Sequence, residues 1–405
     1  MNPLSILRNI GFGTMRDLAK VPAWLAEIMK NRSNADLSKL TAIPNGIDWV
    51  AEKEDILGRA NYLCSVIVRE PDELLKSMPE YIGEEYQGQW AIYCCSMLTH
   101  ALANISVIYP ETKAKSLTII PKLIDAVNTP AIRKYDTMCW HEDAIESLDG
   151  NKSHMTYLSI LAWMITNYRL IGGDTHYDAL LHQCCEALNR RMLESRYDLN
   201  LLSFPNLPIF LPDMVVALIA LRNYGRLFDG KYQETVEAWL HNAKTKWIHR
   251  RSGLLAGKLP GASRRLKYMQ MNGTYSALNC SYLALVDKDF AREQHKLLKQ
   301  RYWKRSVVLN NVVEAIHEYD NRDPKLQMKA GDAGVIFEGI TGGGNAFALG
   351  SATMLGDWHM RYHILRLAEL AGGTIVDGRK RHYRLADFFL VGEATALAMR
   401  TQITR

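Results

Sequence analysis

The chain has 405 residues, of which 48% are hydrophobic and 23% charged, a balance typical of a globular protein with a large core. Its net charge of +6 is spread along the sequence, and the basic cluster Arg264, Arg265 and Lys267 lacks interleaved aromatic residues, which argues against nucleic-acid binding. Seven cysteines without metal-ligand spacing indicate free, buried thiols in a reducing compartment, so we expect a cytoplasmic protein.

The first 40 residues are predicted to form a helical extension, followed by one domain over residues 41–405, because no linker or composition shift divides the chain. Dispersed charges in this extension exclude a secretory signal, and the absence of 18 consecutive uncharged apolar residues predicts no transmembrane span. Residues 21–28 fit an amphipathic helix, which either packs on the domain or makes a weak contact with a membrane surface.

Helical periodicity dominates the rest of the chain. Apolar residues recur at spacings of three and four, as in the run that includes Trp90, Met97 and Leu98. This pattern predicts helices over residues 90–108, 157–170, 179–193, 213–228, 235–247, 275–285, 290–302, 343–355, 358–371 and 389–400.

Strand patterns are rare in the sequence. Residues 374–376 and 382–384 could pair as a hairpin around Asp377 and Gly378. The short loops between helices favour antiparallel neighbours, and several helices are apolar on much of their surface and must be buried on more than one side. We therefore predict an all-α fold in which an inner ring of helices is covered by an outer ring, an α/α toroid with a few short strands near the C-terminus.

Four segments carry motifs of one known family. They read EEYQGQWAIYCCSMLTHALANI (84–105), YDTMCWHEDAIESLDGNKSHMTYLSIL (135–161), SFPNLPIFLPDMVVALIAL (203–221) and AGDAGVIFEGITGGGNAFALGSATMLGD (330–357). In this order they resemble the linalool dehydratase/isomerase-like family. The resemblance implies a six-hairpin α/α toroid, related in fold to six-hairpin glycosidases, and an enzymatic activity. Characterised terpene-alcohol enzymes of this family have cysteines near the places of Ser203 and Pro212, so the resemblance carries over neither linalool as substrate nor thiol chemistry.

The densest group of titratable residues precedes one predicted inner helix. Asp143 and Glu146 are three residues apart and would share a helix face, with Trp140 able to desolvate a carboxyl and raise its pKa. Acids also stabilise helix N-termini, so a capping role is the alternative. The group consists of Asp136, His141, Glu142, Asp143, Glu146, Asp149, His154 and Tyr157.

Three further carboxylates stand out. Asp213 follows a stiff, apolar loop that contains Phe204 and Phe210, where it could act as an acid, a base or a helix N-cap. Asp332 and Glu338 lie in an apolar stretch, where a structural ion pair is the alternative to a chemical role.

The favoured hypothesis is a lyase or isomerase that acts on a hydroxylated, partly apolar small molecule in a central cavity and requires no cofactor and no metal. Asp143 and Asp213 would exchange protons with the substrate, with His154 and Tyr157 orienting and Asp332 a further catalytic candidate. The predicted substrate-binding residues are Trp90, Trp140, His141, Phe204, Phe210 and Glu338. A glycosidase with paired carboxylates and a non-enzymatic binding or assembly protein are the alternatives, and a homo-oligomer is compatible with each.

Overall fold

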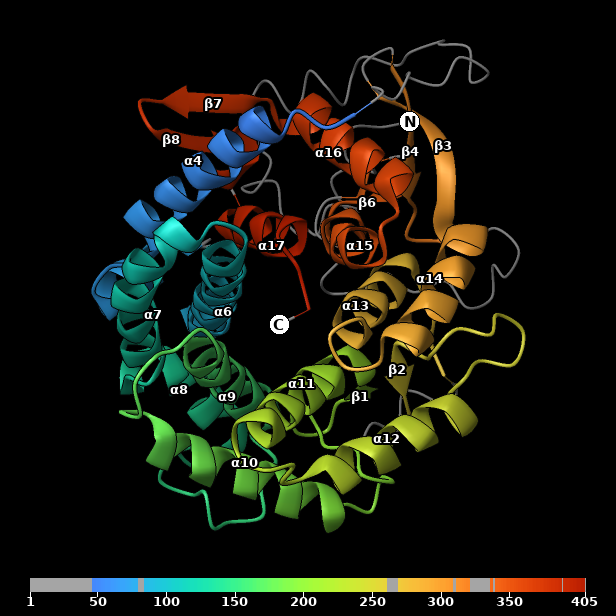
Figure 1. The fold of residues 1–405 in the computed structure, drawn as a ribbon. Helices are drawn as coiled ribbons and strands as arrows, with labels where there is room; N and C mark the ends of the chain where they lie inside the picture. Colours follow the sequence, from blue (N-terminus) through green and yellow to red (C-terminus); the bar gives the residue numbers. More distant parts are fainter. Residues whose placement is uncertain are drawn as a thin grey trace.

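A computed structural model describes residues 46–78, 84–260, 269–308, 311–320, 336–337, 339–387 and 389–404 (Figure 1). Most of these residues are helical, and the strands form two-stranded sheets, which confirms the all-α prediction. The extension 1–40 and its segment 21–28 lie outside the described residues, as do Arg264, Arg265, Lys267, Asp332 and Glu338.

Six helices follow one another around a closed circuit of contacts. Each helix contacts the next in the series, and the last contacts the first (Figure 1). They are α6 (Glu84–Ile108), α9 (Met155–Leu170), α11 (Leu211–Leu227), α13 (Gly273–Leu283), α15 (Gly342–Leu355) and α17 (Leu390–Arg400).

These inner helices are apolar on nearly every side. Every residue of α13 is buried, and α9 is buried from Met155 to Tyr168. A helix without a polar face must be covered all round, which explains its place between neighbours and an outer layer. The stretch Tyr86–Ile108 of α6 is long and apolar enough to cross a membrane, and 83% of its most apolar window is buried inside the fold, as in the core helices of globular proteins.

The outer helices are amphipathic and cover the inner ones. In α14, for example, Phe290, Gln294 and Leu298 are buried at helical spacing while the opposite face is exposed. Helices α10, α12, α14 and α16 contact α9, α11, α13 and α15 respectively. The outer set is α4 (Trp49–Ile67), α5 (Pro71–Lys76), α7 (Lys113–Val127), α8 (Pro130–Trp140), α10 (Asp178–Leu193), α12 (Gln233–Thr245), α14 (Lys288–Tyr302) and α16 (Trp358–Gly372).

Besides the helices, the described residues form four two-stranded antiparallel sheets. The predicted hairpin is confirmed as β7 (Thr374–Asp377) paired with β8 (Lys380–Tyr383). A longer hairpin that the sequence pattern did not predict joins β3 (Trp303–Val308) to β4 (Asn311–Ile316). The other pairs are β1 (Ile209–Phe210) with β2 (Lys258–Leu259), and β5 (Ile336–Phe337) with β6 (Ile340–Thr341).

The C-terminal residues lie among the inner helices (Figure 1). Thr401 and Gln402 are buried, and the Gln402 side-chain amide donates a hydrogen bond of 2.8 Å to the Ser281 carbonyl of α13. Just before them, Arg400 donates hydrogen bonds to Glu52 and Asp55 of α4. These contacts tie the first described helix to the last and leave polar groups, rather than aliphatic side chains alone, near the middle of the circuit.

Candidate functional site

A pocket of about 670 Å³ lies where the start of α6, the end of α8 and the loops before α9 and α11 meet. Apolar walls come from Trp140, Phe204 and Leu207, and polar groups come from His141 and Lys152. We call it the Trp140 pocket. Its described lining comprises Tyr86, Gln89, Cys139, Trp140, His141, Lys152, Phe204, Pro205, Asn206 and Leu207.

Left-handed backbone conformations gather around this pocket. His141 has φ 59° and Asn206 has φ 60°, and both line it, while His154 has φ 43° at the start of α9. A non-glycine residue in this region costs free energy that the surrounding contacts must offset, and such residues concentrate at functional sites. The surrounding contacts therefore stabilise defined backbone conformations in the loops before α9 and α11.

The predicted helix start around Asp143 is wrong. Residues 141–150 form successive turns, and Asp143 Oδ1 accepts hydrogen bonds from the backbone N–H groups of Ile145 and Glu146 at 2.9 and 3.3 Å. A carboxylate that receives amides two and three residues ahead builds a local turn in place of a helix. Asp143 and Glu146 consequently do not share a helix face.

Asp143 also forms an ion pair. Its Oδ2 lies 2.6 Å from Arg133 Nε of α8. Although burial alone raises the pKa of this carboxyl, the hydrogen bonds from Arg133 and from the Ile145 amide hold its pKa below the usual range. Asp143 is thus an ionised structural partner in this arrangement, and its predicted role as a proton donor gains no support from its surroundings.

Behind the pocket wall lies a buried aspartate–histidine pair. His154 Nδ1 lies 2.5 Å from Asp136 Oδ2, and both side chains are inaccessible to solvent. The other histidine nitrogen, Nε2, faces Glu142 Oε1 at 3.3 Å. Burial raises the pKa of Asp136. The Trp140 ring, which lines the pocket, lies 5.4 Å from the His154 ring, centroid to centroid.

Several cations, Lys152 and Arg191 among them, hold the loop that carries these groups. Lys152 donates to the Trp140 carbonyl at 2.7 Å and forms an ion pair with Glu142 at 2.9 Å. Arg191 of α10 donates to the carbonyls of Ser147 and Ser153. The loop is therefore held both by its own Lys152 and, from outside, by Arg191 of α10.

Asp213 lies in the first turn of α11 and is not among the residues that line the pocket. Ser203 Oγ donates a hydrogen bond of 2.6 Å to Asp213 Oδ2, and the next residue, Phe204, lines the pocket. Burial raises the pKa of Tyr135, and the nearby charges of Asp136 and Asp213 raise it further. The fold thus brings Asp136 and Asp213 to the surroundings of one tyrosine, although 77 residues separate them in sequence.

The remaining predicted residues divide between the pocket and the core. Trp140, His141 and Phe204 line the pocket. Trp90 packs edge-on against Phe389, with ring centroids 5.3 Å apart.

Tyr157 and Phe210 are not part of the pocket lining. The Tyr157 hydroxyl donates to the Val127 carbonyl at 3.2 Å, and burial raises its pKa. Phe210 packs against Tyr275 at 6.0 Å, beneath the ammonium group of Lys258. These contacts account for the buried Tyr157 side chain and the half-buried Phe210 side chain.

Sequence reasoning missed Lys152 and Cys139. All seven cysteines are free thiols, as predicted, and five are buried. Cys139 is half-buried and lines the pocket, one residue before Trp140. Only the fold could reveal this, because nothing in the local sequence distinguishes Cys139 from the cysteines of the core.

A separate cluster of Glu314, His359 and His363 has the side-chain types of a metal site. The two histidines are four residues apart on α16, a spacing that was readable in the sequence but was passed over. Glu314 comes from β4, 45 residues earlier than His359, in the hairpin that was not predicted.

Neither a family model nor a curated protein sequence matches this chain.

Proposed function

We propose that the closed circuit of inner helices is a six-hairpin α/α toroid, and that the chain is an acid–base lyase or isomerase for a hydroxylated, partly apolar small molecule. The alternation of inner and outer helices along the chain supports the toroid, since each outer helix contacts the inner helix beside it. The resemblance of residues 135–161 and 203–221 to the linalool dehydratase/isomerase-like family points the same way.

The observation that carries this proposal is the composition of the Trp140 pocket. Aromatic and aliphatic side chains form its walls, and His141 and Lys152 bring proton-transfer and charge-stabilising groups to it. Small-molecule sites are typically apolar hollows with a few polar groups that set orientation. A substrate with a hydrocarbon body and one hydroxyl group matches this lining.

In the proposed dehydration, His141 in its protonated form donates a proton to the leaving hydroxyl, the C–O bond breaks, and water leaves. The Asp213 carboxylate, which lies outside the pocket lining and is hydrogen-bonded to Ser203 next to Phe204, turns toward the substrate and accepts the proton from the neighbouring carbon, so an alkene forms and the charges balance. Lys152 donates a hydrogen bond that orients the hydroxyl oxygen before it leaves as water. The Asp136–His154 pair positions Trp140, whose ring contacts His154, and the loop between α8 and α9.

A glycosidase is less favoured because it needs two carboxyl groups on opposite sides of a sugar. No carboxylate is among the described residues that line the Trp140 pocket, so a glycosidase would need two carboxylates to move into it, whereas the proposed dehydration needs only Asp213. An assembly protein would require no such grouping of histidine, lysine and left-handed turns around a hollow.

The test is a substrate screen with the purified full chain. Tertiary and allylic alcohols of about five to ten carbons, a size suited to the pocket, are incubated in D₂O beside aryl glycosides, and products are followed by gas chromatography and mass spectrometry. Formation of an alkene or a rearranged alcohol supports the proposal. Release of the aryl group alone supports the glycosidase, and no turnover with no saturable binding supports the assembly protein.

A further inference from the structure

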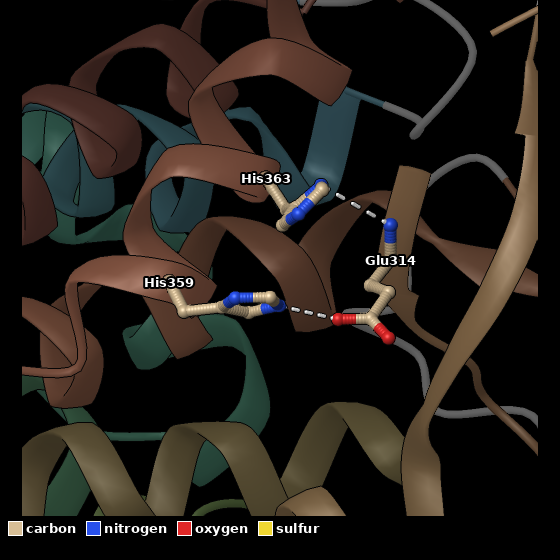
Figure 2. A group of neighbouring side chains, drawn as sticks. All are labelled: Glu314, His359 and His363. Atoms are coloured by element: carbon tan, nitrogen blue, oxygen red, sulfur yellow. Dashed lines mark hydrogen bonds and ion pairs between the residues drawn. The ribbon is translucent and has the colours of Figure 1, made fainter. Parts of the chain in front are cut away.

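A second site of chemical interest lies on the opposite side of the ring from α8 and α9, where α16 packs against the β3–β4 hairpin (Figure 1). His359 and His363 project from consecutive turns of α16 toward Glu314 of β4 (Figure 2). The spacing of four residues places both imidazoles on one helix face.

The three side chains already converge. His359 Nε2 lies 2.5 Å from Glu314 Oε2, and one nitrogen of each histidine and one carboxylate oxygen all lie within 4.8 Å of one another. Ligands around a tetrahedral Zn²⁺ with bonds of about 2.1 Å are roughly 3.4 Å apart. A metal ion between them therefore needs the Glu314–His359 contact to open by about 1 Å, which is feasible because the His359 side chain is 40% exposed.

His363 supplies an independent indication. Its side chain is fully buried, and its Nδ1 accepts a long hydrogen bond of 3.4 Å from the Glu314 backbone N–H. Its Nε2 has no hydrogen-bond partner among the described residues. If the ring proton moves to Nδ1, the long contact with the Glu314 amide is given up and Nε2 presents its lone pair to a cation. A buried polar atom without a partner is costly and calls for an explanation.

The surroundings orient the carboxylate. Trp303 Nε1 donates to Glu314 Oε2 at 3.0 Å, and the Trp303 ring packs edge-on against His363. Glu314 Oε2 thus faces both Trp303 Nε1 and His359 Nε2. Arg305 Nε lies 3.6 Å from Glu314 Oε1 on a half-exposed side chain and competes with an ion for this carboxylate.

We propose that Glu314, His359 and His363 bind a divalent first-row transition-metal ion, with Zn²⁺ the best match. Two histidines and one carboxylate are a frequent protein ligand set for such ions, and the exposed His359 side leaves room for water to complete the coordination. The ion would join α16 to the β3–β4 hairpin, a role distinct from that of the Trp140 pocket.

The test uses the untagged full chain after dialysis against a chelator. Zn²⁺ binding is measured by calorimetry, and Co²⁺ binding by the visible absorption of the bound ion. We expect one ion per chain and a higher melting temperature with Zn²⁺, because a ligand that binds only the folded state stabilises it. The exposed variant His359→Ala should lower the affinity at least tenfold and remove the thermal shift.

His176→Ala is the matched control, since His176 is exposed and lies before α10, away from the cluster. It should bind Zn²⁺ as the parent does. Glu314→Gln should weaken binding while circular dichroism shows an intact fold. If the parent takes up no ion, or if both His359→Ala and Glu314→Gln bind Zn²⁺ with parental affinity, the cluster is only an ion pair between helix and hairpin and the proposal is wrong.

Discussion

His154 and Asp136 form a fully buried pair, 2.5 Å apart between Nδ1 and Oδ2, at the junction of α8 and α9. Their separation of 18 residues spans the turns that carry Trp140 and His141 to the pocket. The pair thus links the helix before the pocket loop to the helix after it.

Replacing Asp136 tests this link. Asp136→Ala leaves the His154 N–H without its acceptor in the core, and we expect a loss of about 1–3 kcal/mol in the free energy of unfolding. Asp136→Asn keeps an acceptor oxygen and should cost less. Urea titrations of the two variants beside the parent measure the difference, and equal stability of Asp136→Ala and the parent would contradict the role of the pair.

The pKa of Asp136 gives this pair a pH dependence. Because the folded-state pKa is raised above 3.8, the group's contribution to stability is fully present below pH 3.8 and is lost as pH rises through the folded value. Asp136→Asn removes this pH-dependent decline in stability, because an amide does not ionise. The stability of the parent relative to Asp136→Asn should therefore fall as pH rises above 3.8, and a difference that does not change with pH would refute the raised pKa.

Arg400 tests the contacts that join α4 to α17. Arg400→Met leaves Glu52 and Asp55 with fewer partners in a mostly buried site, and we expect a loss of about 3–5 kcal/mol. The matched control is Arg292→Met, whose ion pair with Asp289 is exposed and which should cost less than about 1 kcal/mol.

Acidic pH should reduce the loss in the free energy of unfolding that Arg400→Met causes. The arginines lower the pKa values of Glu52 and Asp55 against the opposing influence of burial, so the stabilisation is present above their ordinary values of 4.5 and 3.8. It is lost as pH falls through the lower folded values. The parent and Arg400→Met should converge in stability at acidic pH, and a difference that stays constant down to acidic pH would be inconsistent with this network.

Cys139 reports on the Trp140 pocket. Burial raises the pKa of Cys139, and raises that of Cys64 to about 11, so both thiols should react slowly with iodoacetamide at neutral pH. A bound substrate should protect Cys139 but not Cys64, which lies on α4 outside the pocket. Mass spectrometry of the labelled peptides compares the two rates, and equal protection or none at Cys139 would place the substrate elsewhere.

Asp143 separates the sequence-based mechanism from the one drawn from the structure. Asp143→Asn should lower stability by about 1–2 kcal/mol through its weakened contacts with Arg133 and the turn amides, and should leave turnover within a few-fold of the parent. Urea titration and steady-state kinetics give both quantities. A folded variant without activity would restore Asp143 as the proton donor.

Much of the fold could be predicted because its helices carry strong apolar periodicity. The predicted helix 358–371 is found as Trp358–Gly372, and 343–355 as Gly342–Leu355. The β3–β4 hairpin was missed, since its strands lie directly after α14 and lack a clear alternation of exposed and buried residues.

The site was predictable only in part. Trp140, His141 and Phe204 were found because polar and aromatic residues before inner helices gather at one end of such a fold. Asp143 was misassigned because its acidic neighbourhood resembles a helix start, whereas its partner Arg133 on α8 is identified only by the tertiary structure. The Glu314–His359 contact was out of reach for the same reason.

The measurement that tests the central claim most directly is turnover of the best substrate from the screen by His141→Gln, beside His176→Gln as an exposed control. Loss of the proton-donating imidazole should lower kcat by about 100-fold or more, while the control keeps parental turnover and both variants keep the parental circular dichroism spectrum. Parental turnover by a folded His141→Gln would show that the Trp140 pocket does not supply the acid.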